Sequence, residues 1–231
     1  MAKRKTKREK KLLLSHDFGK AYFLQEGVNL LKKSTNVKFD ASVDIHVNLN
    51  INPQKADQIV RGVVDLPHGT GKARRVLVIC TPDKEEEVKK AGADYAGCDE
   101  YLKKLENKWK EVDVIVAIPI LMAKVGKVGK IIGPMGLMPS PKNGTVTPDP
   151  AKAVREIKAG KIEIKNDEYG QIHASIGRVS FSNEKLEDNI NEVISTIKKL
   201  KPSSSKGGYI QSITLASTMG KGIKIDQSSI K

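Results

Sequence analysis

The chain has 231 residues, with 41 Lys and Arg against 27 Asp and Glu, which gives a net charge of +14. This length allows one large or two small domains with buried cores, and so basic a balance indicates a polyanionic partner, either nucleic acid or an anionic membrane. No apolar run approaches the ~20 residues of a membrane span. The basic start is not followed by the apolar core or the cleavage site of a secretory signal. We therefore expect a cytoplasmic protein that does not enter a membrane.

Few residues suit catalysis, metal binding or base stacking. Cys80 and Cys98 are too few and too isolated for a disulfide framework or a zinc knuckle. The four histidines have neither metal-ligand spacing nor a nearby nucleophile in sequence. Aromatic residues make up only 4% of the chain. This is too few for the base-stacking surfaces of RNA-recognition sheets and single-strand-binding proteins. We therefore expect no metal and no enzyme activity, and recognition through phosphates, sugars and shape.

The first part of the chain predicts a basic segment, a helix and two strands. Met1–Lys11 holds seven Lys or Arg residues against one Glu, which suits contact with RNA. Apolar residues at three- and four-residue spacing predict a helix over Phe18–Lys33. Ala41–Asn50 alternates apolar and polar residues, as in a half-buried strand with a polar outward face. A second strand is expected over Gln58–Leu66, followed by a turn at Pro67–Gly71.

The pattern changes after this turn, where short apolar strands alternate with helices. Strands are expected over Val76–Cys80, near Asp94–Ala96 and over Val112–Ile118. Helices are expected between them, over Pro82–Lys90 and Asp99–Lys108. Such alternation is typical of an α/β unit with largely parallel strands.

The segment Lys124–Thr147 combines glycines, prolines and lysines, and no acidic residue occurs between Val114 and Pro148. Glycine admits backbone angles that a side chain forbids, and proline removes a donor, so we expect a loop of defined shape. A positive loop with close backbone access suits phosphates; the alternative is a solvated loop whose charge only maintains solubility. The candidate phosphate contacts of the loop are Lys124, Lys127, Lys130 and Lys142. After the loop, a helix is expected over Asp149–Lys158.

Glycine motifs give only weak evidence for nucleotide binding. A phosphate-binding ATPase loop requires G-x-x-x-x-G-K-[ST], and no Gly-Lys pair of this chain is followed by Ser or Thr. Gly69-Thr70-Gly71 begins a dinucleotide fingerprint, but Arg74 stands at the place of the third glycine, and a turn is the better interpretation. Gly126–Gly129 and Gly133–Gly136 match the short GXXG of KH domains, which supports backbone approach to phosphates rather than a KH fold.

The last part of the chain returns to the alternation of the first. Strands are expected over Lys161–Lys165, Gln171–Phe181 and Tyr209–Ala216. A helix is expected over Asn183–Leu200, and Pro202 ends it.

Neither end of the chain alone has enough periodic apolar surface to close a core. We therefore predict two domains. Residues 1–67 and 161–231 form a discontinuous α+β domain, and residues 68–160 form an inserted α/β domain.

Three segments resemble one protein family. Gly129–Thr147 reads GKIIGPMGLMPSPKNGTVT and closely resembles the signature of the large-subunit ribosomal protein one (L-one) family, bacterial type, which builds the mobile stalk beside the tRNA exit site. Lys38–Lys72 and Ser212–Asp226 resemble further segments of that family, in the same order. The family usually has Arg where Met135 stands and Pro where Lys221 stands. The resemblance implies the same split arrangement, with a three-layer α/β domain inserted.

The resemblance also implies a function. Members of this family are structural constituents of the large ribosomal subunit that bind stalk rRNA, assist movement and release of exit-site tRNA, and repress translation of their own operon mRNA. They need no cofactor, are monomers when free, and act in the cytoplasm bound to the ribosome. The resemblance implies that Lys124, Lys127, Lys130 and Lys142 are accessory phosphate or tRNA contacts. The rRNA contacts implied by position are Lys38, Phe39, Ser42, Asp44, Ser212, Thr218, Met219 and Gly220.

Physical chemistry alone leaves alternatives. Thr218-Met219-Gly220 offers a small polar donor, a flexible apolar contact and bare backbone, which fit a shallow RNA minor groove, but a plain strand-end turn explains it equally well. A nucleotide-dependent enzyme that uses the glycine-rich segment is the strongest rival, and it would bind ATP or a dinucleotide. A nonspecific nucleic-acid chaperone is a second rival, and it would not prefer folded rRNA over random duplex.

Overall fold

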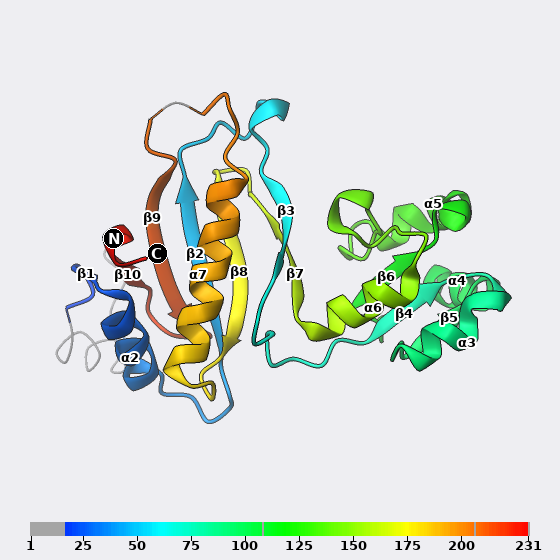
Figure 1. Ribbon diagram of the computed structural model, residues 1–231, viewed down its shortest axis with the longest axis horizontal. Helices are drawn as coiled ribbons and strands as arrows, with labels where there is room; N and C mark the ends of the chain where they lie inside the picture. The colour runs from blue at the N-terminus through cyan, green and yellow to red at the C-terminus, as the bar shows by residue number, and fades with distance from the viewer. Residues whose placement is uncertain (1–16, 108, 206, 231) are drawn as a thin grey trace, which may run out of the picture. The chain divides into compact units, whose positions relative to one another are not determined.

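The computed structural model describes residues 17–107, 109–205 and 207–230 (Figure 1). The basic segment Met1–Lys11 lies outside these residues. The chain divides into two compact units, one containing the described residues up to Gly71 and those from Ile164 onward, the other Lys72–Glu163. Both units combine helices and strands, which confirms the expected mixed α and β fold class. No helix in the described ranges is long and apolar enough to cross a bilayer.

The discontinuous unit is built on a five-stranded sheet in the order β1-β10-β9-β2-β8 (Figure 1). β1 runs parallel to β10, and the remaining neighbours are antiparallel. In β2, which lies between β9 and β8, every second residue is buried, as the alternation of its sequence predicted. The strands are β1 Ala21–Tyr22, β2 Ser42–Leu49, β8 Gln171–Arg178, β9 Ile210–Ser217 and β10 Ile223–Ile225. A separate two-stranded sheet pairs β3 Arg61–Asp65 with β7 Lys161–Lys165.

Two helices pack on this sheet, α2 (Leu24–Ser34) against β9 and β10, and α7 (Asn183–Lys199) against β8. A Cβ added to Gly27 would lie against the Ile225 side chain, so α2 approaches β10 closely because it carries a glycine there. Apolar residues of α7 at helical spacing, such as Ile190 and Val193, are fully buried. The sheet therefore has one face covered by helices.

The N-terminal helix begins later than the sequence predicted. Residues 21–22 form the edge strand β1, whose Tyr22 carbonyl accepts a hydrogen bond from Asp226 N at 2.9 Å. Phe23 keeps extended backbone angles and precedes the first helical residue. The prediction of a helix from Phe18 was wrong because pairing with β10, a strand the sequence analysis did not predict, takes these residues out of the helix.

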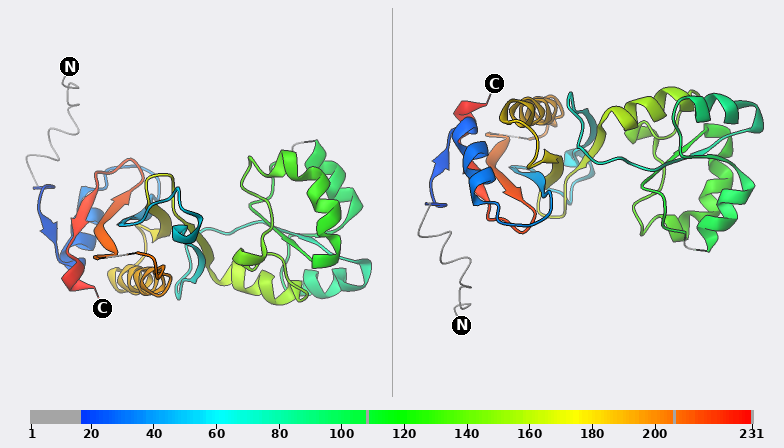
Figure 2. Two further views of the ribbon diagram at one scale, coloured as in Figure 1. Left: turned by 90° about the horizontal axis from the view of Figure 1, so that it is seen from above. Right: turned by 90° about the horizontal axis from the view of Figure 1, so that it is seen from below.

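The other unit is a three-layer α/β fold around a parallel sheet in the order β5-β4-β6. Helices lie on both sides of this sheet in Figure 2. On one side Val88 of α3 and Val154 of α6 join the core, and on the other Leu105 of α4 and Val128 of α5 do. The elements are β4 Val76–Ile79, α3 Pro82–Lys90, β5 Tyr95–Gly97, α4 Asp99–Glu106, β6 Val114–Ala117, α5 Met122–Ile132 and α6 Pro150–Ala159.

The loop expected over Lys124–Thr147 is a helix in its first third. α5 continues to Ile132 because Val125, Val128 and Ile132 fall at helical spacing and are buried in the core. The glycines of this helix cost roughly 1 kcal/mol each relative to Ala, and burial of the three apolar side chains outweighs that cost. The remainder is irregular, and Gly136 adopts a positive φ of 71°.

A buried asparagine joins α7 to the turn that follows β3. Asn189 is fully buried, and its side-chain amide donates to Gly69 O at 3.0 Å and to Ile176 O at 2.7 Å. Its oxygen accepts from His68 N at 3.2 Å. One side chain thus satisfies the buried carbonyl of Ile176 and two partly buried main-chain groups of the turn.

Asn189→Ala should lower the free energy of unfolding by about 1–3 kcal/mol, because it removes the hydrogen bond to the buried Ile176 carbonyl as well as two hydrogen bonds to the turn. Urea denaturation monitored by circular dichroism measures this. Asn191→Ala is the matched control on the same helix, since Asn191 Oδ1 has no hydrogen-bond partner among the described residues. The control should change stability by less than about 0.5 kcal/mol. Equal losses for the two variants would contradict the assigned role of Asn189.

Candidate nucleic-acid interface

The face of the five-stranded sheet opposite the buried one is polar and only weakly charged. β2 presents Ser42, Asp44, His46 and Asn48 on this face, all partly exposed. Across the strand pairs they meet mainly hydroxyl, amide and imidazole groups. The partners on β8 are Arg178, Ser175, His173 and Gln171, and those on β9 are Ala216, Thr214 and Ser212. Such a surface suits directional hydrogen bonds better than bulk attraction of charge.

The start of β2 and the end of β9 meet at one end of this face. Thr218 N donates to Ser42 O at 3.0 Å, and Ser42 N donates to Thr218 Oγ1 at 3.2 Å. These residues come from opposite ends of the chain, 176 positions apart. The sheet register thus brings two of the sequence-predicted segments together.

The segment before β2 is anchored to the same place. Thr35 Oγ1 lies 2.9 Å from Ser217 Oγ. Nearer to the strand, Arg178 Nη1 donates to Asp40 O at 2.8 Å, and the Asp40 carboxylate accepts from the backbone and hydroxyl of Ser180. The predicted contacts Lys38 and Phe39 lie between these anchors. Both are exposed, with 55% of the Phe39 surface open to solvent.

The turn after β9 is strained and apolar. Met219 is the one side-chain-bearing residue in the described ranges with positive φ, at 62°, and 73% of its surface is exposed. This backbone region costs an ordinary residue roughly 1–2 kcal/mol, and such strain concentrates at functional sites. At Gly220 a Cβ would lie 3.0 Å from Ser217 O. A larger residue at Gly220 therefore disturbs the turn itself.

These residues form one surface, which we call the loop–turn surface. The residues of the loop–turn surface are Lys38, Phe39, Ser42, Asp44, Thr218, Met219 and Gly220. Ser212 is not part of it, because it pairs with Asn48 at the opposite end of β2. Ser212 and Thr218 are six positions apart along extended chain, which corresponds to about 20 Å.

A histidine pair in the middle of the open face was missed by the sequence analysis. The Nδ1 atoms of His46 and His173 lie 2.8 Å apart, and His173 Nε2 lies 3.4 Å from Asp167 Oδ2. Burial, and then the neighbouring His173, lower the pKa of His46 below its ordinary value of 6.5, so His46 is neutral at pH 7. No group of three or more potential ligands in the described part of the chain could hold a metal ion.

The four candidate lysines all belong to the inserted unit. Lys124 Nζ donates to Asp99 Oδ1 at 2.9 Å, and this hydrogen bond raises the pKa of Lys124. Lys127 and Lys130 are exposed on α5, opposite its buried valines. Lys142 is exposed in the short turn Pro141–Asn143. Lys124 is thus engaged with an acidic partner, and the other three present their side chains to solvent.

The two positions where the chain departs from the family pattern have ordinary surroundings. Lys221 Nζ lies 5.0 Å from the centroid of the Phe18 ring, a cation–π distance. Met135 is partly exposed between Gly133 and Gly136, in the turn after α5.

Met219→Asn should raise the free energy of unfolding by up to about 1 kcal/mol, because asparagine accepts the left-handed conformation more readily than methionine. Chemical denaturation measures this change. Met219→Gln is the matched control, since it retains a Cβ and a long side chain, and should leave stability unchanged. A loss of stability in Met219→Asn would show that the Met219 side chain stabilises the turn.

Comparison with known proteins identifies close relatives. Residues 31–221 match the ribosomal protein L1p/L10e family. The chain is 56% identical to the large ribosomal subunit protein uL1 of Amoebophilus asiaticus (strain 5a2) over 224 residues, which is 97% of each chain. It is 56% identical to the uL1 protein of Bacteroides fragilis (strain YCH46) over 226 residues, covering 98% of this chain and 97% of the relative. The uL1 protein of Porphyromonas gingivalis (strain W83) is 54% identical over 225 residues, 97% of each chain.

Proposed function

Because the chain belongs to the ribosomal protein L1p/L10e family, we propose that it is a structural component of the large ribosomal subunit that binds large-subunit rRNA through the loop–turn surface. The observation that carries this proposal is the exposed, strained Met219 beside hydrogen-bonding groups from both ends of the chain. The similar full-length proteins are large ribosomal subunit proteins by name. In this function the protein is not an enzyme, uses no cofactor, and acts in the cytoplasm as part of the ribosome.

The chemistry of the loop–turn surface matches a folded RNA. An A-form helix displays ribose hydroxyls and base edges in a wide, shallow minor groove. Met219 supplies apolar contact to ribose, and Asp44 accepts hydrogen bonds from hydroxyl or amino groups. Lys38 reaches phosphate. The bare backbone of Gly220 allows the turn to approach closely.

Further functions follow from the same proposal. The rRNA site lies in the mobile stalk, where the protein assists movement and release of exit-site tRNA, with Lys127, Lys130 and Lys142 as phosphate contacts. The protein is a monomer when free and represses translation of its own operon mRNA by binding that message with the same loop–turn surface. Message and rRNA then compete for one site.

Met219→Gln should weaken binding to a stalk rRNA fragment roughly fivefold to thirtyfold, the equivalent of about 1–2 kcal/mol of lost apolar contact. Filter binding at several salt concentrations measures this. The slope of log affinity against log salt should stay unchanged, because no positive charge is removed. Lys38→Gln is the contrasting variant, and its slope should become shallower by about 0.7–0.9. Wild-type affinity in both variants would place the rRNA site elsewhere.

The two rival functions make different predictions for the wild-type protein. A nucleotide-dependent enzyme would bind ATP or a dinucleotide in equilibrium dialysis, whereas we expect no binding. A nonspecific chaperone would bind random duplex as tightly as stalk rRNA, whereas we expect a clear preference for the folded fragment.

We also propose that the rRNA-binding domain comprises residues 1–67 and 161–231, with residues 68–160 as an inserted domain. The division of the chain into two compact units supports this. Replacing Lys72–Gly160, which lies within the proposed insert, by a short glycine-rich linker should leave a folded protein that binds the rRNA fragment, since closing a short loop has a modest entropic cost. Circular dichroism and filter binding test this. An unfolded product would contradict the domain proposal alone.

A further inference from the structure

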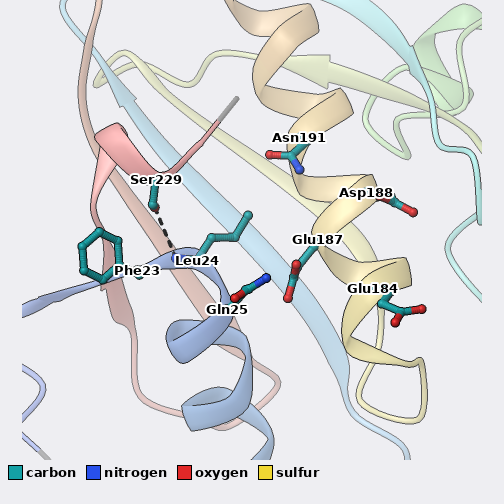
Figure 3. Close-up of a pocket in the computed structure, with 8 residues that line it drawn as sticks. All are labelled: Phe23, Leu24, Gln25, Glu184, Glu187, Asp188, Asn191 and Ser229. Atoms are coloured by element: carbon teal, nitrogen blue, oxygen red, sulfur yellow. Dashed lines mark hydrogen bonds between the residues drawn. The ribbon is translucent and has the colours of Figure 1, made fainter.

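A groove of about 490 Å³ lies between the start of α2 and the first turns of α7, and none of its lining residues belongs to the loop–turn surface (Figure 3). Leu24 N donates to Ser229 Oγ at 3.2 Å and closes one side of the groove. The residues that line it are Phe23, Leu24, Gln25, Glu184, Glu187, Asp188, Asn191 and Ser229. We call it the α2–α7 groove.

The α2–α7 groove is acidic in a strongly basic protein. Glu184, Glu187 and Asp188 contribute three carboxylates, in a chain whose net charge is +14. Asp188 Oδ2 lies 3.0 Å from His68 Nε2. Within the described ranges no lysine or arginine forms a salt bridge with Glu184 or Glu187. Carboxylates in this position attract a cationic ligand.

The groove also has features that negative charge does not explain. The Phe23 side chain lies at the rim of the groove (Figure 3), and 59% of the Phe23 surface is exposed. Asn191 Oδ1 is buried in the wall without a hydrogen-bond partner among the described residues. A ligand for the groove therefore carries positive charge and some apolar surface.

The chain itself contains a segment of this chemistry, immediately before the first described residue. Residues 1–11 hold seven Lys or Arg, and Leu12–Leu14 follow. The Asp17 carbonyl accepts a hydrogen bond from Tyr22 Oη at 2.7 Å, and Tyr22 precedes Phe23 of the groove. The segment therefore leaves the described structure close to the groove.

The segment is also long enough. Lys10 and Asp17 are seven positions apart, which gives a reach of about 23–25 Å in extended chain. The stretch of α7 from Glu184 to Asn191 is about 10 Å long. The reach of the segment therefore exceeds the length of the acidic stretch of α7.

We propose that the α2–α7 groove binds the basic N-terminal segment of the same chain when the protein is free of RNA. Tethering gives the segment a local concentration in the millimolar range, so individually weak ion pairs suffice. RNA phosphates compete with the groove for the same lysines. Docking thereby reduces nonspecific RNA binding by the segment, a role that does not depend on which RNA the loop–turn surface recognises.

Carbodiimide cross-linking of the full-length, RNA-free protein tests the contact directly. The expected products are amides between lysines of residues 3–11 and Glu184 or Glu187, identified by mass spectrometry. Their yield should fall severalfold between about 0.05 and 0.5 M salt, as the Debye length shortens. A mixture of isotopically labelled and unlabelled protein separates links within one chain from links between two. Absence of these products, or links only between two copies, overturns the proposal.

Binding to a random duplex RNA provides the second measurement. Glu184→Gln with Glu187→Gln should raise affinity roughly threefold to tenfold, which corresponds to a segment docked about two-thirds to nine-tenths of the time. The rise should disappear when Lys7, Lys10 and Lys11 are also changed to Gln. The matched control, Glu26→Gln with Asp65→Asn, removes the same charge from exposed positions outside the groove. An equal rise in the control, or with the three lysines replaced, overturns the proposal. Because the probe is random duplex, either result is distinct from failure of rRNA recognition.

Discussion

The antiparallel pairing of β2 with both β8 and β9 is the constraint on which the discontinuous unit depends. β2 comes from the first part of the chain, and both of its neighbours come from the last part. Asp44 pairs with Ser175 on one side and with Ala216 on the other. Neither part can satisfy the hydrogen bonds of its strands without the other. The cost of closing the intervening loop grows only logarithmically with its length, so a whole second unit can occupy it.

The same pairing produces the loop–turn surface. Thr218 meets Ser42 because the β2–β9 register places the end of one strand at the start of the other. Thr35 and Asp40 are held at this end by contacts with Ser217, Arg178 and Ser180. With its neighbours held in this way, the surroundings can keep Met219 in a conformation that it would not adopt alone. The rigid sheet thus supports a strained, exposed apolar side chain.

Local patterns in the sequence predicted the elements that bury a regular apolar face. β2 and α7 follow their alternation and periodicity, and the parallel sheet of the inserted unit follows its short apolar runs. β1 and β10 were missed because strands of two and three residues show no period. α5 was predicted as a loop because glycine and lysine content outweighed three buried apolar residues. The His46–His173 contact could not be predicted, since it depends on a register between strands 127 residues apart. The separation of Ser212 from Thr218 has the same cause.

In the proposed function, the protein separates two kinds of affinity for RNA. Its excess charge acts over a Debye length and does not distinguish sequences, whereas the open sheet face has few charges and would act through hydrogen bonds and shape. If charge were spread over that face, any duplex would bind there and compete with the specific RNA. An acidic groove that holds the basic segment would reduce this competition further, because it withdraws positive charge until a polyanion displaces it. On this view the carboxylates of α7 increase specificity by weakening nonspecific binding, even though none of them lies on the loop–turn surface.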